Sequence, residues 1–563
     1  MSIQHLGPIA GIAASAPWIA TAGYDNRLIL WDQASGQALQ MAHHDHLVNQ
    51  CAFSSDGQFL VSASSDYSAR VWSLPELQLQ AVLSGHADDV DMAAFSPDDR
   101  LIATCALDRC VRIFLRSGAC LHTMRGHTGN VLSLAWSHDG QQVVTSSVDG
   151  TIRRWDADSG LQTDCTDLGV RSDSVEMART GSIFAGDDKG RIALIEDHGL
   201  RFVQAHQAGV KKIALNEKRG ILVSLSYDRS LAIWQLSQDA GQSQLQEICR
   251  TELPACIWAR AATILDDGRI ACGTFGSTYA VFDPAQQQWA LDGVAAGSAL
   301  NTVLAHGDAV YSVGDAGSVR RNGQPYQEIG SLCNFLAASG PHLYCGGQLG
   351  QIFDAHSARV LYQHHAPLNC AAPLQRHGQA HLAVGSYTGE ILIFEVQASG
   401  ALRLVHTMAL YENAVKGISV TAEQLFSVCA NTDVAWHNIA DWSLHQRVNR
   451  AHERIANGCC SVQDGGFASI GRDLQLRLWH QGQQTSYRTP HRHSVKCIGV
   501  NARGDSVLTG SYGGTVARFD LRTRQWAPMQ RLSHAGISAI TWDAQQQQFL
   551  ASSYDGHIYP VAA

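Results

Sequence analysis

The sequence predicts an all-β fold in which two seven-bladed β-propellers follow one another along the chain. Three observations predict this class. A segment of small polar, turn, strand-forming and aromatic residues recurs from TAGYDNRLILWD (21–32) to ASSYDGHIYPVA (551–562). Fourteen copies can be counted, with a mean spacing of about 41 residues. Each copy has room for four short strands, and this period with four strands is typical of a propeller blade.

The fourth copy shows how one unit is expected to fold. Alternating residues and turn signals predict strands at 130–137, 141–147, 151–156 and 161–168. A sheet this small cannot bury both of its faces alone, so neighbouring sheets must stack against each other. We therefore expect the hydrophobic core to lie between sheets.

Several short motifs resemble those of a known repeat family. The dipeptide Trp-Asp stands at 31–32 and 155–156, and Gly-His stands at 85–86 and 126–127. On these motifs the chain is similar to WD40-repeat proteins along essentially its whole length. The match weakens within the chain: Phe114 replaces a Trp, and segments 272–283 and 345–354 lose most of the motif, so the count between 272 and 432 depends on spacing.

The resemblance implies a tetrad in which a His, a strand Ser or Thr, the turn Asp and the Trp form one hydrogen-bonded chain. His and Asp are 22 residues apart in three of four matching sets, and Asp and Trp are 6 apart in all four. The sets are His44, Ser62, Asp66 and Trp72; His127, Thr145, Asp149 and Trp155; His206, Ser224, Asp228 and Trp234; and His452, Ser469, Asp473 and Trp479. Such a network specifies blade geometry, so we interpret these residues as structural and not as a hydrolase triad.

Fourteen units exceed the four to eight that close one ring, which predicts two domains. The widest interval between copies precedes Gly276, and a segment rich in Pro and Gln follows. We place the domains at 1–286 and 287–563, the second with degenerate repeats. Either residues 2–6 complete the seventh sheet and 287–293 the last one, or the N-terminus completes the last sheet and interlocks the domains; the sequence leaves both arrangements open.

Composition excludes several function classes. The chain has 563 residues, 45% of them hydrophobic and 16% charged, as in globular proteins. Its net charge of −9 and lack of long runs of like charge predict no nucleic-acid partner and no membrane association. The fifteen cysteines are expected to be reduced and mostly buried. Arginine outnumbers lysine in a chain rich in Ala, Gly and Gln, which indicates a bacterial origin, and the N-terminus without a basic start indicates a cytoplasmic location.

No common catalytic motif is present, so no catalytic residue, cofactor or metal site is assigned. Local groups of histidine remain candidates for binding Zn, Cu or Fe, together with Cys459 and Cys460. The groups are His43, His44 and His46; His364 and His365; and His491 and His493. None matches the usual ligand spacing, and His44 and His491 occupy the structural His position of the repeat.

Two repeated positions are predicted to contact partners. By resemblance to the family, the residue before the turn Asp and positions near the start of the inner strand lie on the top face of the ring. The first position holds Tyr24, Tyr227, Phe275, Tyr387, Tyr512 and Tyr554, and the second holds Asp89, Asp91, Asn49, Asn130, Lys211, Lys416 and Lys496. Tyr is favoured where binding energy concentrates, although it can also shield the turn and pack on its neighbour.

These observations predict a cytoplasmic scaffold that presents propeller top faces to protein or peptide partners. The alternative is an enzyme or obligate enzyme subunit in a bacterial small-molecule pathway, of the toxoflavin type for example, with a small-molecule ligand or a His-ligated metal in a channel. A clamp on a cytoskeletal filament is a third hypothesis.

Overall fold

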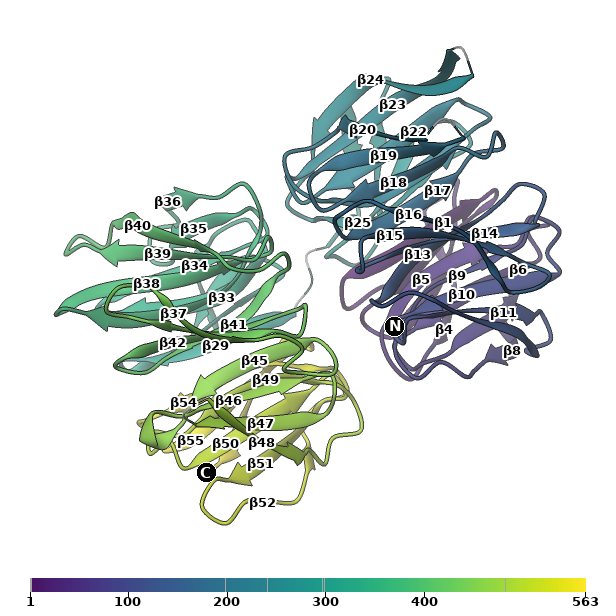
Figure 1. The fold of residues 1–563 in the computed structure, drawn as a ribbon. Helices are drawn as coiled ribbons and strands as arrows, with labels where there is room; N and C mark the ends of the chain where they lie inside the picture. The colour runs from purple at the N-terminus through teal and green to yellow at the C-terminus, as the bar shows by residue number, and fades with distance from the viewer. Residues whose placement is uncertain (1–2, 198, 240, 296, 298, 481) are drawn as a thin grey trace. The chain divides into compact units, whose positions relative to one another are not determined.

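The structure is a computed structural model that describes every residue except 1–2, 198, 240, 296, 298 and 481. The described residues form 56 strands and one short 3-10 turn, Gln463–Gly465, which confirms the all-β class. The chain divides into two compact units, Met1–Ala296 (unit 1) and Gly297–Ala563 (unit 2), coloured purple to teal and green to yellow in Figure 1. No helix in the described part of the chain is long and apolar enough to span a membrane.

Unit 1 contains seven four-stranded antiparallel sheets. Their strands, sheet by sheet, are β1 (Ile9–Ser15), β2 (Trp18–Gly23), β3 (Arg27–Asp32) and β4 (Ala38–His43); β5 (Val48–Phe53), β6 (Phe59–Ser64), β7 (Ala69–Ser73) and β8 (Gln78–Leu83); β9 (Val90–Phe95), β10 (Leu101–Ala106), β11 (Cys110–Leu115) and β12 (Cys120–Arg125); β13 (Val131–Trp136), β14 (Gln142–Ser147), β15 (Thr151–Asp156) and β16 (Gln162–Asp167); β17 (Ser172–Met177), β18 (Ile183–Asp187), β19 (Arg191–Glu196) and β20 (Gly199–Gln204); β21 (Val210–Asn216), β22 (Ile221–Ser226), β23 (Ser230–Asp239) and β24 (Gln242–Glu252); and β25 (Ile257–Ile264), β26 (Ile270–Thr274), β27 (Ala280–Asp283) and β28 (Gln288–Ala290).

Unit 2 also contains seven sheets, of which the last two depart from four strands. Their strands are β29 (Leu300–His306), β30 (Ala309–Gly314), β31 (Ser318–Arg321) and β32 (Gln324–Glu328); β33 (Cys333–Ser339), β34 (His342–Gly347), β35 (Gln351–Asp354) and β36 (Val360–Gln363); β37 (Leu368–Arg376), β38 (Gln379–Ser386), β39 (Glu390–Val396) and β40 (Leu402–Ala409); β41 (Val415–Val420), β42 (Gln424–Cys429), β43 (Val434–Asn438) and β44 (Leu444–Val448); β45 (Ala456–Ser461), β46 (Phe467–Gly471), β47 (Gln475–His480) and β48 (Gln483–Arg488); β49 (Val495–Val500), β50 (Ser506–Ser511), β51 (Thr515–Asp520), β52 (Gln525–Trp526) and β53 (Gln530–Arg531); and β54 (Ile537–Asp543), β55 (Gln548–Ser553) and β56 (Ile558–Ala562).

The first strands of the sheets lie around the centre of each unit. In unit 1, β1 contacts β5 on one side and β25 on the other, and in unit 2, β29 contacts both β33 and β54. Each unit is therefore a closed circle of seven sheets. Burial follows this order: the second strand β6 is buried over most of its length, whereas the fourth strand β8 is largely exposed.

The circles close without an exchanged strand. Segment 2–6, one of the two segments that we expected to complete a sheet, forms no strand in its described part. Segment 287–293 contains β28, which pairs with β27 inside unit 1 and does not complete the last sheet. Every sheet is thus built from one contiguous segment, and no strand pairing joins β1 to β25, although the N–H of His5 donates to the carbonyl of Ser277 at 2.9 Å.

The last sheet of unit 2 has three strands, and among the described residues no fourth strand pairs with β56. Pro560 lies within this edge strand, opposite Leu550. Proline offers no N–H, which makes the edge a poor template for another strand. A cavity of about 470 Å³ lies between this sheet and the first sheet of unit 2, with Ser312, Arg320 and His557 in its lining.

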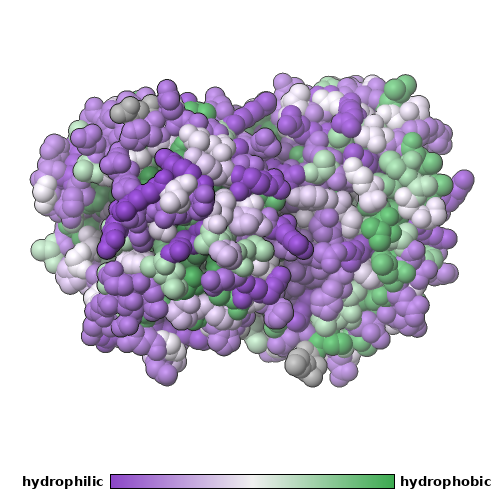
Figure 2. Space-filling view, turned by 90° about the horizontal axis from the view of Figure 1, so that it is seen from below, coloured by the Kyte–Doolittle hydropathy of each residue, from purple (hydrophilic) through white to green (hydrophobic). Residues whose placement is uncertain are grey.

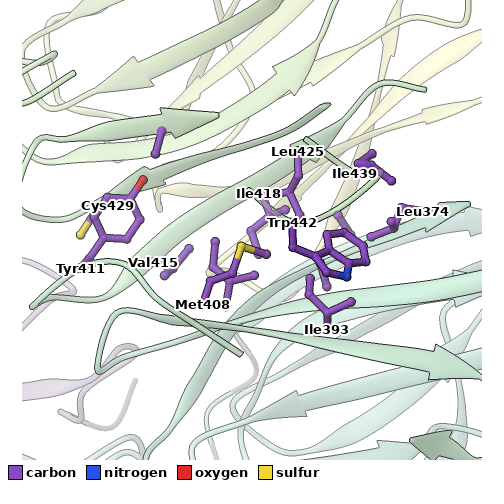
Figure 3. Close-up of a cluster of buried hydrophobic side chains, with 14 residues drawn as sticks. Leu374, Ile393, Met408, Tyr411, Val415, Ile418, Leu425, Cys429, Ile439 and Trp442 are labelled. Carbon is purple, nitrogen blue, oxygen red and sulfur yellow. The ribbon is translucent and has the colours of Figure 1, made fainter. Parts of the chain in front are cut away.

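The hydrophobic core lies between adjacent sheets, as the sequence predicts. Figure 3 shows the cluster between the sheets β37–β40 and β41–β44, where Ile393 and Met408 meet Ile418 and Leu425. Burying one such side chain contributes about 1.5–3 kcal/mol, so stacking is the main force that holds neighbouring sheets together. On the face seen in Figure 2, hydrophilic residues dominate and hydrophobic residues gather in limited patches.

All fifteen cysteines are free thiols, as the sequence predicts. Two of them, Cys120 and Cys165, are exposed and not buried. Both lie in fourth strands, β12 and β16, which face solvent.

Candidate functional site

In the structure, hydrogen bonds join the residues within each of the four tetrads that the sequence spacing predicts. In the fourth sheet the ring of His127 lies 2.9 Å from Asp149 Oδ2 and 2.8 Å from Thr145 Oγ1, and Trp155 Nε1 donates to that hydroxyl at 2.9 Å. The sets of His44, His206 and His452 make the same three contacts at 2.7–3.3 Å. These residues are therefore engaged with one another inside the sheets.

The protonation of a tetrad follows from its burial. Burial lowers the pKa of the His44 imidazole more than its hydrogen bond to Asp66 raises it. Burial raises the pKa of Asp228, but the hydrogen bond and charge of His206 outweigh it and hold the pKa at about 2. An ionised carboxylate held this way fixes the turn and is poorly suited to accept a proton in catalysis.

The structure contains two further sets that the sequence spacing did not predict. His5 contacts Asp25 at 3.0 Å and Thr21 at 2.7 Å, and Trp31 completes this tetrad. Its His and Asp are 20 residues apart, which hid the match. In the third sheet His86 contacts Asp108 and Thr104, as its Gly-His motif could have indicated, while Phe114 takes the place of the Trp.

The residue before the turn lies next to the start of the first strand in every sheet. The N–H of Tyr24 donates to the carbonyl of Pro8 at 2.8 Å, and the N–H of Tyr554 donates to Gly536 at 3.0 Å. Because the first strands surround the centre, the two predicted positions together form a rim at one end of each circle. We call these rims mouth 1 (Tyr24, Asp91, Arg171, Asp173, Asp188, Lys211, Tyr227, Trp258, Arg260, Phe275) and mouth 2 (Asn301, Asp315, Asn334, Asn369, Tyr387, Lys416, Asn457, Arg472, Lys496, Tyr512, Tyr554).

The charges of mouth 1 are paired with each other. Lys211 Nζ lies 2.6 Å from Asp173 Oδ2 and also contacts Asp188, and its side chain is 8% exposed. Arg171 lies 2.7 Å from Asp173 on the other side. Burial raises the pKa of Asp91 to about 6, although Arg260 opposes the shift. The cations and anions of this rim therefore largely neutralise one another.

The aromatic side chains of mouth 1 also pack on neighbours. Tyr24 meets Trp258 edge-on at 5.0 Å between ring centroids, Trp258 lies 5.6 Å from Phe275, and Lys211 lies over the ring of Tyr227 at 4.8 Å. Phe275 and Asp89, predicted to face a partner, are 9% and 2% exposed. These two side chains therefore offer little surface to a partner, which corrects that prediction.

Asparagine at the first-strand position joins adjacent sheets in mouth 2. Asn301, Asn334, Asn369 and Asn457 each donate from Nδ2 to the first carbonyl of the next sheet's first strand, at 2.7–3.1 Å. Asn49 makes the same bond in unit 1. In two sheets of unit 2, Lys416 and Lys496 take this position.

Mouth 2 gathers three cations. Lys416 Nζ lies 5.2 Å from the centroid of Tyr387, and Lys496 Nζ and Arg472 Cζ lie 6.0 and 5.8 Å from that of Tyr512. Within the part of the chain that the structure describes, no carboxylate forms an ion pair with Lys416 or Lys496. Burial, followed by the charges of Lys496 and Arg472, lowers the pKa of Lys416 to about 7.

Mouth 2 offers little negative charge in return. Burial raises the pKa of Asp315 to about 7, and only one of its carboxyl oxygens accepts a hydrogen bond, from Asn301 at 2.9 Å. Tyr512 and Tyr554 stack with centroids 6.5 Å apart. Arg472 lies directly before Asp473, which is a sequence signal for this position, but the residues predicted there were aromatic and did not include it.

Part of the chain matches a family model and several known proteins. Residues 36–73, 77–114 and 118–156 match the WD domain, G-beta repeat. A WD repeat-containing protein 26 homolog of Arabidopsis thaliana is 27% identical over 33% of this chain and 33% of its own length. Autophagy-related protein 16 of the same plant is 25% identical over 42% and 49%. Transducin beta-like protein 3 of Mus musculus is 34% identical over 42% and 33%.

The chain spans a third to a half of the length of these curated relatives. They come from a plant and a mammal, and a nuclear distribution protein PAC1-2 that also matches comes from Uncinocarpus reesii. These relatives give no support to the bacterial origin that the composition indicated. With the motifs, the tetrads and the family match on residues 36–156, the chain is shown to contain WD40 repeats.

Proposed function

We propose that this chain is a cytoplasmic scaffold that binds segments of partner proteins at its mouths, and that mouth 2 binds an acidic segment. The observation that carries the proposal is the convergence of Lys416, Lys496 and Arg472 on one rim without a matching carboxylate for the two lysines. A buried cation repelled by its neighbours gains most from an anionic ligand, because the ligand offsets both the desolvation and the repulsion.

The side chains around these cations suit a peptide. Tyr387 and Tyr512 lie beside the lysines, and their rings offer flat apolar surface next to charge. Tyr and Arg are the residue types in which binding energy concentrates at interfaces. Carboxylate or phosphate groups on an extended segment could therefore reach the cations while its side chains contact the rings.

The relatives support an interaction role in general terms. Proteins named as an autophagy-related protein, a transcriptional corepressor and a nuclear distribution protein share sequence with this chain. Their names describe different processes and no common reaction. They lend no support to the alternative of an enzyme in a small-molecule pathway.

In mouth 1 we propose a second, weaker contact surface at the exposed parts of Tyr24 and Tyr227. Its charges are already neutralised internally, since Lys211 pairs with Asp173 and Asp188. A partner bound there would be held more by apolar contacts than by charge interactions. The two mouths are thus proposed to differ in the kind of segment they accept.

Binding of defined peptides tests this function. Labelled peptides rich in Asp and Glu, and matched peptides carrying Asn and Gln instead, are titrated with the full chain and followed by fluorescence anisotropy. We expect the acidic set to bind, and a Lys416→Met, Lys496→Met variant to bind at least about tenfold more weakly, because each lost charge-assisted contact is worth about 1.5–3 kcal/mol.

Lys189→Met is the matched control, because Lys189 is an exposed lysine on a turn of unit 1. It should leave the affinity unchanged. Equal binding of the acidic and amide peptides, or unchanged binding by the double variant, would contradict the proposal.

A further inference from the structure

One sheet of unit 2 keeps the His of the tetrad but replaces its three partners. The N–H of His364 donates to the carbonyl of Gly350 at 2.8 Å, the same backbone bond that His44 makes to Asn26. The positions of the strand hydroxyl, the turn Asp and the Trp hold Val384, Thr388 and Phe394. The imidazole has therefore lost its usual partners.

A carboxylate and a second imidazole come together there. His364 Nε2 lies 3.1 Å from Glu390 Oε2, and His365 Nε2 lies 4.0 Å from the same oxygen. The two imidazole centroids are 4.1 Å apart. One ligand atom from each of the three residues lies within 4.8 Å of the others. Glu390 stands where the complete tetrads of His44 and His206 carry Ser68 and Ser230.

Surrounding contacts hold His364 and Glu390 in place. His364 Nδ1 lies 3.0 Å from the carbonyl of Ala366, to which it donates when it carries the proton. When the proton is on Nε2, the Ala366 N–H donates to Nδ1 at 3.2 Å and Nε2 donates to Glu390. Thr388 Oγ1 donates to Glu390 Oε2 at 2.7 Å. Gly389 between them has φ +95°, and a side chain there would collide with the Tyr411 carbonyl, so the turn that presents Glu390 is fixed.

At 3.1 Å, either a proton or a metal ion lies between His364 Nε2 and Glu390 Oε2. The proton belongs to a neutral Nε2–H imidazole, which gives a hydrogen bond, or to an imidazolium, which gives an ion pair. A metal ion binds the ionised carboxylate and the imidazole nitrogen that has lost its proton, so it would replace that proton.

We propose that His364, His365 and Glu390 form a Zn²⁺ site. Two imidazoles and one carboxylate are a set that zinc takes where three protein ligands leave one position open. Ligand atoms at about 2.0–2.1 Å from zinc in a tetrahedral arrangement lie about 3.3 Å apart, and the observed 3.1 and 4.0 Å bracket this value. Small side-chain rotations would complete the geometry.

Exposure defines the open position. The side chain of His364 is 5% exposed, that of Glu390 24% and that of His365 46%. One side of the cluster therefore faces solvent, where water or a donor from a bound protein can supply the fourth ligand. The other metal candidates fit less well: His44 and His491 bond to hydroxyls of their own sheets, and burial raises the pKa of Cys460 to about 12.

Zinc titration of the full chain tests the site. After metal is removed with a chelator, wild type, Glu390→Gln and His365→Ala are titrated with Zn²⁺ at pH 7 by calorimetry. We expect one equivalent to bind wild type, and at least about 100-fold weaker binding to either variant, because loss of an outer hydrogen-bond partner alone costs 10–100-fold. His445→Ala is the control, because His445 is exposed on β44, and it should keep the equivalent.

A second measurement guards against misfolding. Melting temperatures of the metal-free proteins show whether each variant folds, and added Zn²⁺ should raise the melting temperature of wild type and of His445→Ala only. If Glu390→Gln does not fold, His365→Ala, whose side chain is half exposed, decides the question. Wild type that binds no equivalent, or a folded variant that binds zinc as tightly as wild type, overturns the proposal and leaves the proton-bridged contact.

Discussion

Mouth 1 and mouth 2 occupy the same positions of the repeat but treat charge in opposite ways. In mouth 1 the buried Lys211 contacts two carboxylates of the neighbouring sheet, that of Asp173 on β17 and that of Asp188 in the turn after β18. In mouth 2, Lys416 is buried beside Lys496 and Arg472, and its pKa falls to about 7. The shared backbone therefore does not fix the charge of a mouth. The side chains at two positions per sheet set it: in mouth 1 they pair cations with anions, and in mouth 2 they bring three cations together.

We expect the largest loss of stability when the ion pairs of Lys211 in mouth 1 are broken. Lys211→Met leaves Asp173 and Asp188 buried with Arg171 as their ion-pair partner and the charge of Arg260 near Asp173, and we expect the free energy of unfolding to fall by about 3 kcal/mol. Urea unfolding followed by tryptophan fluorescence measures it. The exposed Lys189→Met should change stability by less than about 0.5 kcal/mol. Equal effects of the two changes would show that the pairing contributes nothing.

The lysine in mouth 2 should make the stability of the protein depend on pH. The pKa of Lys416 is about 7 in the folded protein and 10.5 ordinarily, so between these values the unfolded chain binds more protons. Stability contributed through this group therefore rises with pH, by at most about 1.4 kcal/mol per unit, starting near pH 7. We expect wild type to gain about 2 kcal/mol relative to Lys416→Met between pH 7 and 9. Parallel profiles of the two proteins would contradict the lowered pKa.

The smallest effects should separate the tyrosines of the two mouths. Tyr24→Ala removes the edge-on contact with Trp258 and should cost about 1 kcal/mol of stability beyond the lost burial, without changing the affinity for acidic peptides. Tyr512→Ala should weaken that affinity severalfold, because the ring lies beside Lys496 and Arg472. Thermal unfolding and peptide anisotropy measure the two outcomes. The same loss of affinity in both variants would remove the proposed division of roles.

The fold class and the tetrads could be predicted from local sequence patterns, because both depend on fixed spacing within about 25 residues. The same spacing failed for His5, which lies two residues nearer its Asp than usual. For segment 287–293 the strand was expected but its sheet was wrong, because β28 pairs with β27 in unit 1 and spacing does not encode which strand it meets. Sequence patterns identify an element most clearly when it spans several repeats of its own periodicity.

The mouths could be predicted only in part. The tyrosines could be predicted because they share one position of the repeat. Trp258 and Arg260 could not, because they lie in β25, whose irregular register hides the repeat. Asp173 on β17 meets Lys211 on β21 of the next sheet, and that neighbourhood exists only once the two sheets have packed together. Glu390 was not predicted as a site residue for a similar reason, because its partners His364 and His365 lie in the connection before the sheet. Charge balance in such a site depends on three-dimensional neighbours, which spacing does not encode.

The contact between β1 and β25 has a consequence for how unit 1 folds. All other seams of the circle join segments that follow one another, so each can form as soon as the next segment leaves the ribosome. The seam between the first and seventh sheets joins residues almost a full unit apart and has no shared strand to guide it. Contacts of such sequence separation form late, because closing a long loop costs entropy before packing returns it. During synthesis the unit therefore passes through an open arc whose two apolar ends stay accessible until the seventh sheet is complete.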